Sequence, residues 1–301
     1  MLIHHNGRSE TVERALADFG IEESFANAAT RFKEHYHYDI GPSAVARSSK
    51  ITAQQAMEYI DIKFSNSDDS AKTPGLEKML LELDGCEIRT AELIPSNNTK
   101  ETTPVYKNPK KEKLINWRDV RLGFVRPLDS ESKIFAGGLD SYPKVINQMH
   151  DAAVFIGMTP KTEVIGVADG GIGLSEELKR QFPSMHFILD KTHLKDHLYA
   201  TSEAIGIKRK KRSAWVEQRL QQVSNGKVDA VLKALEDDNE KKPNQRLKRL
   251  IGYIERFKNS LDYNHYNSIF KFLTPWSCCP PVLQSRGRLQ FAKVPVDHVL
   301  C

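Results

Sequence analysis

Blocks of apolar and polar positions alternate along the chain with different periods. In residues 10–60, apolar side chains recur three and four positions apart, which predicts helices. Three short apolar runs follow later, and they end at Asp84, Asp169 and Asp190. The run before Asp169 is uniformly apolar, as expected for a strand that is buried on both faces of a sheet.

Strand-like and helix-like stretches alternate through the middle of the chain. Strands are expected at 79–84, 87–94, 117–125, 163–168 and 185–189, and helices at 141–156, 174–181 and 194–205. Consecutive strands followed by alternating strands and helices predict an α/β fold, with helices flanking a mixed sheet. From 208 to about 262 the chain is charged, and its apolar stripes predict further helices.

These changes in pattern divide the chain into five segments. They are a helical segment (1–62), a polar linker (63–75), an α/β core (76–207), a charged helical insertion (208–268) and an atypical tail (269–301). The tail contains one acidic residue and three of the four cysteines, which is an abrupt change in composition.

The helical segment has the layout helix, short glycine-containing turn, helix. Ser24 and Ser43 are the expected N-caps of its second and third helices. This layout is that of a DNA-binding helix-turn-helix, and a small helical bundle without a DNA role has the same pattern.

Composition narrows the class of protein only a little. The 301 residues carry a net charge of +5 with a pI of about 8.8, which is compatible with nucleic acid but does not require it. No apolar run approaches the ~20 residues of a membrane helix, and the N-terminus lacks a signal-peptide pattern. The cysteines have neither zinc-ligand spacing nor a disulfide framework, so we expect a cytoplasmic protein without a membrane partner.

The candidate chemistry lies in the carboxylates that follow the apolar runs. Asp84-Gly85 and Asp169-Gly170 are also favoured pairs for tight turns, so each alone is a weak signal. Ligands of open α/β sheets bind at the carboxyl ends of strands, and two such aspartates on neighbouring strands could hold a divalent metal.

Four motifs in a fixed order resemble bacterial insertion-sequence DDE transposases, in the branch related to Mutator-type elements. They are Leu83-Asp84-Gly85, Asn116-Trp117-Arg118-Asp119-Val120-Arg121-Leu122-Gly123, Val167-Ala168-Asp169-Gly170-Gly171 and Ile188-Leu189-Asp190-Lys191-Thr192-His193-Leu194. The resemblance covers roughly residues 20–265. It implies a ribonuclease-H-like core that cleaves and joins DNA with Mg²⁺, for which Mn²⁺ is a possible substitute.

The resemblance also assigns roles to residues. Asp84 and Asp169 match the first two catalytic acids, which bind the metal. Asp190 and His193 match a later motif and are expected to support the metal site or position DNA, although His193 could instead be a capping or core residue. The implied partners are the terminal repeats of the element and target DNA, bound by a multimer in a bacterial cell.

One departure from the family concerns its third acid, a glutamate on a helix after the insertion. No glutamate occurs from Ile269 onward, and Glu255 and Asp262 are the remaining candidates without a spacing argument. A truncated or frameshifted gene would explain the unusual tail, and the copy would then be inactive in strand transfer.

Two further points stay open at this level. The first is the role of a basic run that consists of Lys208, Arg209, Lys210, Lys211 and Arg212. These side chains can contact DNA phosphates, or they can be the solvated start of a helix. The alternatives to a transposase are a non-catalytic DNA-binding protein on the same fold and a two-aspartate nuclease.

Overall fold

The computed structural model describes residues 7–65, 75–95, 111–139 and 141–270. The chain divides into two compact units. We call residues 7–65 the helical unit and residues 75–270 the sheet unit, and we describe each by itself.

The helical unit contains three helices: α1 (Glu10–Glu22), α2 (Phe25–Tyr36) and α3 (Pro42–Ser65). Their shared core includes Leu16, Phe32 and Val45, all nearly inaccessible to solvent. The predicted N-cap at Ser24 is confirmed, because its hydroxyl accepts a hydrogen bond from the backbone N–H of Asn27.

Two sequence predictions at α3 were wrong. The helix begins at Pro42 rather than after Ser43, and the carbonyl of Gly41 accepts the first backbone N–H groups. Proline is favoured at the first helical position because its missing N–H would have no partner there. The helix also continues to Ser65, so the first residues of the predicted linker are helical.

The sheet unit is built on five strands in the order β3-β2-β1-β4-β5. The strands are β1 (Lys78–Pro95), β2 (Lys111–Pro127), β3 (Ile134–Gly138), β4 (Glu163–Ala168) and β5 (His186–Leu189). β1 pairs antiparallel with β2 and parallel with β4, while β2–β3 is antiparallel and β4–β5 parallel. The predicted α/β fold with a mixed sheet is therefore confirmed.

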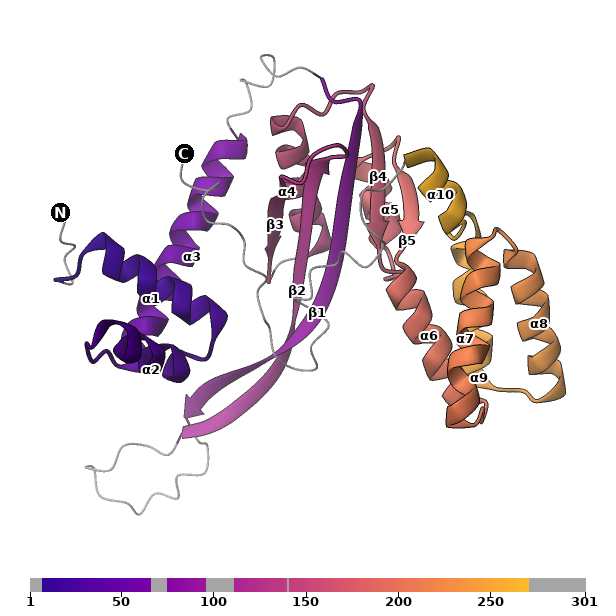
Figure 1. Ribbon diagram of the computed structural model, residues 1–301, viewed down its shortest axis with the longest axis horizontal. Coiled ribbons are helices and arrows are strands. Elements are labelled where there is room, and N and C mark those ends of the chain that lie inside the picture. Colours follow the sequence, from indigo (N-terminus) through magenta and orange to yellow (C-terminus); the bar gives the residue numbers. More distant parts are fainter. Residues whose placement is uncertain (1–6, 66–74, 96–110, 140, 271–301) are drawn as a thin grey trace. The chain divides into compact units, whose positions relative to one another are not determined.

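The first strand differs from its prediction. Sequence reading ended a strand at Asp84 and placed another at 87–94, but β1 runs through both without a break. β2 pairs with it over its whole length, from Met79↔Pro127 to Pro95↔Lys111, and this pairing overrides the local turn preference of Asp84-Gly85. Beyond the other strands, β1 and β2 continue as a two-stranded ribbon (Figure 1).

Helices flank the sheet as the sequence predicted. α4 (Tyr142–Phe155) packs on β2 and β3, and α5 (Leu174–Gln181) packs on α4. α6 (Lys191–Ala204) is followed by a charged helical segment, whose elements are α7 (Arg209–Ser224), α8 (Val228–Lys241), α9 (Gln245–Arg256), a 3-10 turn at Lys258–Ser260 and α10 (Tyr263–Phe270). In the described parts of the chain, we find no helix both long and apolar enough to cross a bilayer.

Candidate metal centre

The sheet register places two aspartates side by side. The parallel pairing of β1 with β4 ends at Leu83↔Ala168, and Asp84 and Asp169 are the next residues of the two strands. Asp84 is not at a strand end, since β1 continues with β2 alone. It nevertheless lies where the parallel part of the sheet stops, which is where ligands of such sheets bind.

β5 brings a third strand end to the same edge. Asp190 follows β5, and its backbone N–H donates to the carbonyl of Ala168, so the chain passes close to Asp169. The carboxylate of Asp190 then caps α6 (Lys191–Ala204) by accepting a hydrogen bond from Thr192 N–H at 2.9 Å. This cap explains why α6 begins three residues earlier than predicted and places His193 in its first turn.

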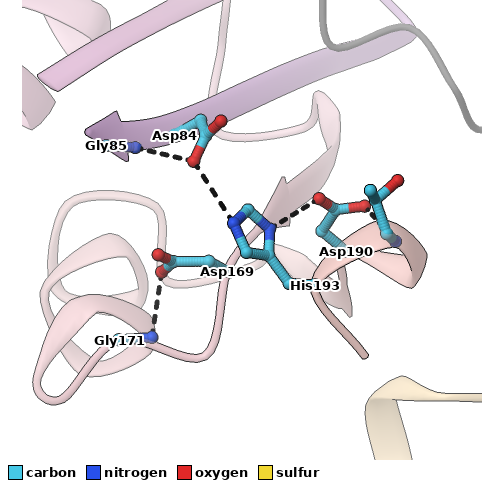
Figure 2. Close-up of polar contacts among 7 residues, drawn as sticks. Asp84, Gly85, Asp169, Gly171, Asp190 and His193 are labelled. Carbon is cyan, nitrogen blue, oxygen red and sulfur yellow. Dashed lines mark hydrogen bonds and ion pairs between the residues drawn. The ribbon is translucent and has the colours of Figure 1, made fainter. Parts of the chain in front are cut away.

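His193 connects the acidic residues of the site. Its Nδ1 lies 2.7 Å from Oδ2 of Asp190, and its Nε2 lies 3.7 Å from Oδ1 of Asp84 (Figure 2). One ligand atom each from Asp84, Asp169 and His193 lies within 4.8 Å of the other two. Among the described residues, this is the cluster that could hold a metal ion.

Backbone groups fix the direction of both aspartates. Gly85 N–H donates to Oδ1 of Asp84 at 2.7 Å, and Gly171 N–H donates to Oδ1 of Asp169 at 2.9 Å. A carboxylate accepts through two oxygens, so one backbone N–H does not use up its capacity to bind a ligand. Asp190 holds the imidazole from behind, an arrangement that orients histidine ligands of metals.

Hydrogen bonding and burial raise the pKa values of three groups at or near the site. Hydrogen bonding to Asp190 raises the pKa of His193 to about 9, with further contributions from the nearby carboxylates. Burial raises the pKa of Asp84, although the charge of His193 opposes this shift. Burial also raises the pKa of Glu82, two residues earlier on β1, to about 7. The site concentrates negative charge, which a cation would relieve.

α9 holds the loop that carries Asp169. A side chain at Gly170 would approach the ring of Tyr253 to 2.3 Å, so the backbone of this loop lies directly against the tyrosine. Nη2 of Arg256 lies 3.5 Å from the carbonyl of Gly171 and 3.4 Å from Glu176 on α5. We call Tyr253 and Arg256 the α9 clamp. The only sequence signal for it was the pair Gly170-Gly171.

Tyr142 is a second neighbour of the site that sequence reading missed. Burial raises its pKa, and the charge of Asp169 adds to the effect. The guanidinium of Arg121 stacks 3.7 Å from the centre of the Tyr142 ring. Arg121 belongs to the Trp-Arg-Asp-Val-Arg motif of β2, so this motif lies next to the site through Tyr142.

The remaining candidate acids do not join the cluster. Asp262 accepts a hydrogen bond from His265 N–H at the start of α10 and lies against Gly226. Glu255 lines a surface hollow with Asp229 and Lys258. Within the described part of the chain, the third member of the cluster is therefore His193 and not a late acid.

The basic run begins α7 and divides into two kinds of residue. Arg212 donates to the carbonyl of Ile207 and pairs with Glu203 at 2.9 Å, so it has a structural role. The side chains before it are exposed, namely Lys208, Arg209, Lys210 and Lys211. Positive charge at a helix N-terminus opposes the helix dipole, so these cations do not serve the stability of α7.

Comparison with known proteins finds no match to this chain, neither among models of protein families nor among curated proteins.

Proposed function

We propose that this protein cleaves DNA with the help of a divalent metal, as an insertion-sequence transposase built on a ribonuclease-H-like sheet. The observation that carries the proposal is the convergence of Asp84, Asp169 and His193 at one edge of the sheet. The strand order supports the proposal because it places β4, which Asp169 follows, parallel to and next to β1, which carries Asp84.

The donor set of the cluster fits a divalent cation. Two carboxylates and one imidazole suit Mn²⁺, whereas Mg²⁺ prefers oxygen ligands and would rely on the two aspartates. A cation held there would polarise a phosphodiester as a Lewis acid. Gly85 and Gly171 keep the carboxylates aimed at it, and Asp190 fixes the ring of His193.

The surface of α3 supports DNA as the substrate. Exposed polar side chains recur at helical spacing along its first half, at Ser43, Arg47, Lys50 and Gln54. Residues 40–57 contain no acid, although acidic residues outnumber basic ones nine to seven over the helical unit. A face of this composition suits the recognition helix of a helix-turn-helix.

A nuclease is the second candidate. The transposase family that the chain resembles has a third catalytic acid, and neither Glu255 nor Asp262 reaches the cluster. This absence among the two candidates favours a two-aspartate nuclease. An enzyme of this kind would cut arbitrary DNA, whereas a transposase would act at specific ends.

The proposal predicts metal-dependent nicking that requires Asp169. The full chain should convert supercoiled plasmid to the open circle with Mn²⁺ or Mg²⁺, and Asp169→Asn should lower the rate at least ~100-fold, because it removes a charged metal ligand. Asp129→Asn, an exposed change in the turn after β2, is the control and should leave the rate unchanged. DNA binding without nicking in any of these proteins would overturn the proposal and indicate a non-catalytic DNA-binding protein.

A further inference from the structure

The outer edge of β2 in the ribbon is exposed. β3 pairs with β2 only from Arg121 to Val125, so in the described part of the sheet unit no strand flanks residues 112–119 on that side. Every one of these residues is exposed, whereas Ile88 and Thr90 in the facing part of β1 are half-buried. An exposed strand edge can pair with another strand, and proteins normally protect it.

Large apolar side chains of this strand are exposed on both faces of the ribbon. Leu114, Ile115 and Trp117 are exposed by 43%, 41% and 64%. Charged residues surround them, and the ribbon (86–95 with 111–120) contains four acidic and four basic residues. A balanced set of charges does not favour DNA phosphates, which attract a basic surface. It suits a protein surface of complementary pattern.

We propose that β2 pairs antiparallel with β2 of a second copy of this chain, across a two-fold axis at Ile115. In this register Glu112 lies opposite Arg118 of the second copy, and the symmetry repeats the pair. Lys113 lies opposite Trp117 of the second copy, which places a cation beside an aromatic ring. The two ribbons then form one four-stranded sheet in which the exposed apolar side chains are neighbours.

The charges select this register over its neighbour. If the axis lay at Asn116, Glu112 would face Val120 and Arg118 would face Leu114. That register would match only Asp119 with Lys113, and it would lose both the Glu112–Arg118 pair and the contact of Lys113 with Trp117. The edge of β1 offers a weaker match, because Arg89 is the single cation between Glu87 and Glu92.

A charge swap tests the pairing in the full chain without DNA. Sedimentation velocity at low salt should show a reversible dimer, and Arg118→Glu or Glu112→Arg should each raise its dissociation constant at least ~10-fold, because like charges then face each other twice. The double variant, Glu112→Arg with Arg118→Glu, should return to within ~3-fold of the parent, since the pairs are restored with reversed polarity. Circular dichroism checks that each variant is folded.

Two results would overturn the inference: a parent chain that stays monomeric at ~100 µM, well above the concentration at which a specific interface forms, or a double variant no better than the single ones. Loss of DNA affinity in Arg118→Glu and its gain in Glu112→Arg, with unchanged sedimentation, would show that the ribbon binds nucleic acid instead.

A cysteine scan tests the register itself. In a background with the four native cysteines replaced by serine, Ile115→Cys should oxidise to a linked dimer because residue 115 faces itself. Trp117→Cys should not, since residue 117 faces Lys113 of the second copy, and residue 117 of that copy lies four positions away along the strand. Equal cross-linking at the two positions would contradict an axis at Ile115. Neither this scan nor the charge swap requires metal or DNA, so its outcome is independent of the proposed cleavage.

Discussion

The imidazole of His193 links the charge of the candidate metal centre to pH. Its raised pKa means that the ring carries a proton at neutral pH in the absence of metal, held between Asp190 and Asp84. A cation that binds Nε2 must displace this proton. The same ring therefore stabilises the metal-free site at low pH and becomes available as a ligand as the pH rises.

We expect the affinity for Mn²⁺ to rise about tenfold per pH unit between 7 and 9, and to level off above the pKa of about 9. Asp190→Asn should lower the pKa of His193 toward its ordinary value near 6.5, because the largest cause of the shift is removed. The plateau should then begin about two units lower. Isothermal titration calorimetry with Mn²⁺ between pH 6 and 9.5 measures both curves.

Asp196→Asn is the matched control for this experiment. It removes an exposed carboxylate from the same helix and should leave the pH profile unchanged. An affinity of the parent chain that does not vary between pH 6.5 and 8.5 would show that the imidazole is not a ligand.

At the scale of elements, the sequence predicted the buried strand β4 better than the short edge strand β3 and the end of β1. The apolar run before Asp169 was predicted at 163–168 and is β4 without correction, because burial on both faces leaves a continuous signal. β3 (Ile134–Gly138) was missed, since five residues with one buried side chain give no periodicity. The local pattern predicts a strand end at Asp84-Gly85, because β2, the partner that extends β1, lies far along the chain.

The candidate site was predictable only in part, because some of its contacts join segments that lie far apart in the chain. Asp84 and Asp169 precede glycines after apolar runs, so the local pattern identified them. The sequence-based role for His193, as a supporting group, did not anticipate that its Nε2 approaches Asp84, because the start of α6 depends on the cap at Asp190. The α9 clamp depends on tertiary packing between segments about 85 residues apart, which periodicity does not show.

The clamp leads to a prediction for Gly170→Ala. The new methyl group would lie 2.3 Å from the Tyr253 ring, so α9 or the Asp169 loop must move. We expect a loss of ~1–3 kcal/mol in the free energy of unfolding, measured with urea, and weaker Mn²⁺ binding.

Gly252→Ala is the control on the same helix. Nothing lies within 4 Å of the added methyl group, so this change should stabilise the protein by ~0.5–1 kcal/mol through helix propensity. If Gly170→Ala proved as stable as this control, the packing of α9 on the loop would be refuted.

At the scale of the molecule, the candidate DNA-binding face and the candidate metal centre lie in different units. The helical unit is slightly acidic overall, but the first half of α3 has Arg47 and Lys50 on an exposed face without nearby acids in sequence. The metal cluster lies entirely in the sheet unit. We therefore expect DNA affinity and metal affinity to respond to different substitutions.

Changing Arg47 and Lys50 together to Ala should lower affinity for a duplex of random sequence about tenfold and reduce its salt slope by about two, since two phosphate contacts are lost. Fluorescence anisotropy at several salt concentrations measures this, and Mn²⁺ binding should be unchanged. The control is Arg14→Ala with Lys33→Ala, which removes two cations elsewhere in the helical unit. Equal losses in both proteins would indicate a general effect of charge rather than a recognition helix.

The α9 clamp has a consequence for the order of events during translation. All three residues of the candidate metal centre have been synthesised once residue 193 is made, yet Tyr253 and Arg256 are added about 60 residues later. Until they leave the ribosome, the loop of Asp169 lacks the contacts that hold it. A nascent chain would thus carry every residue of the candidate metal centre before the site was held in place, and the cleavage that we propose would begin only after the helices of the insertion had folded.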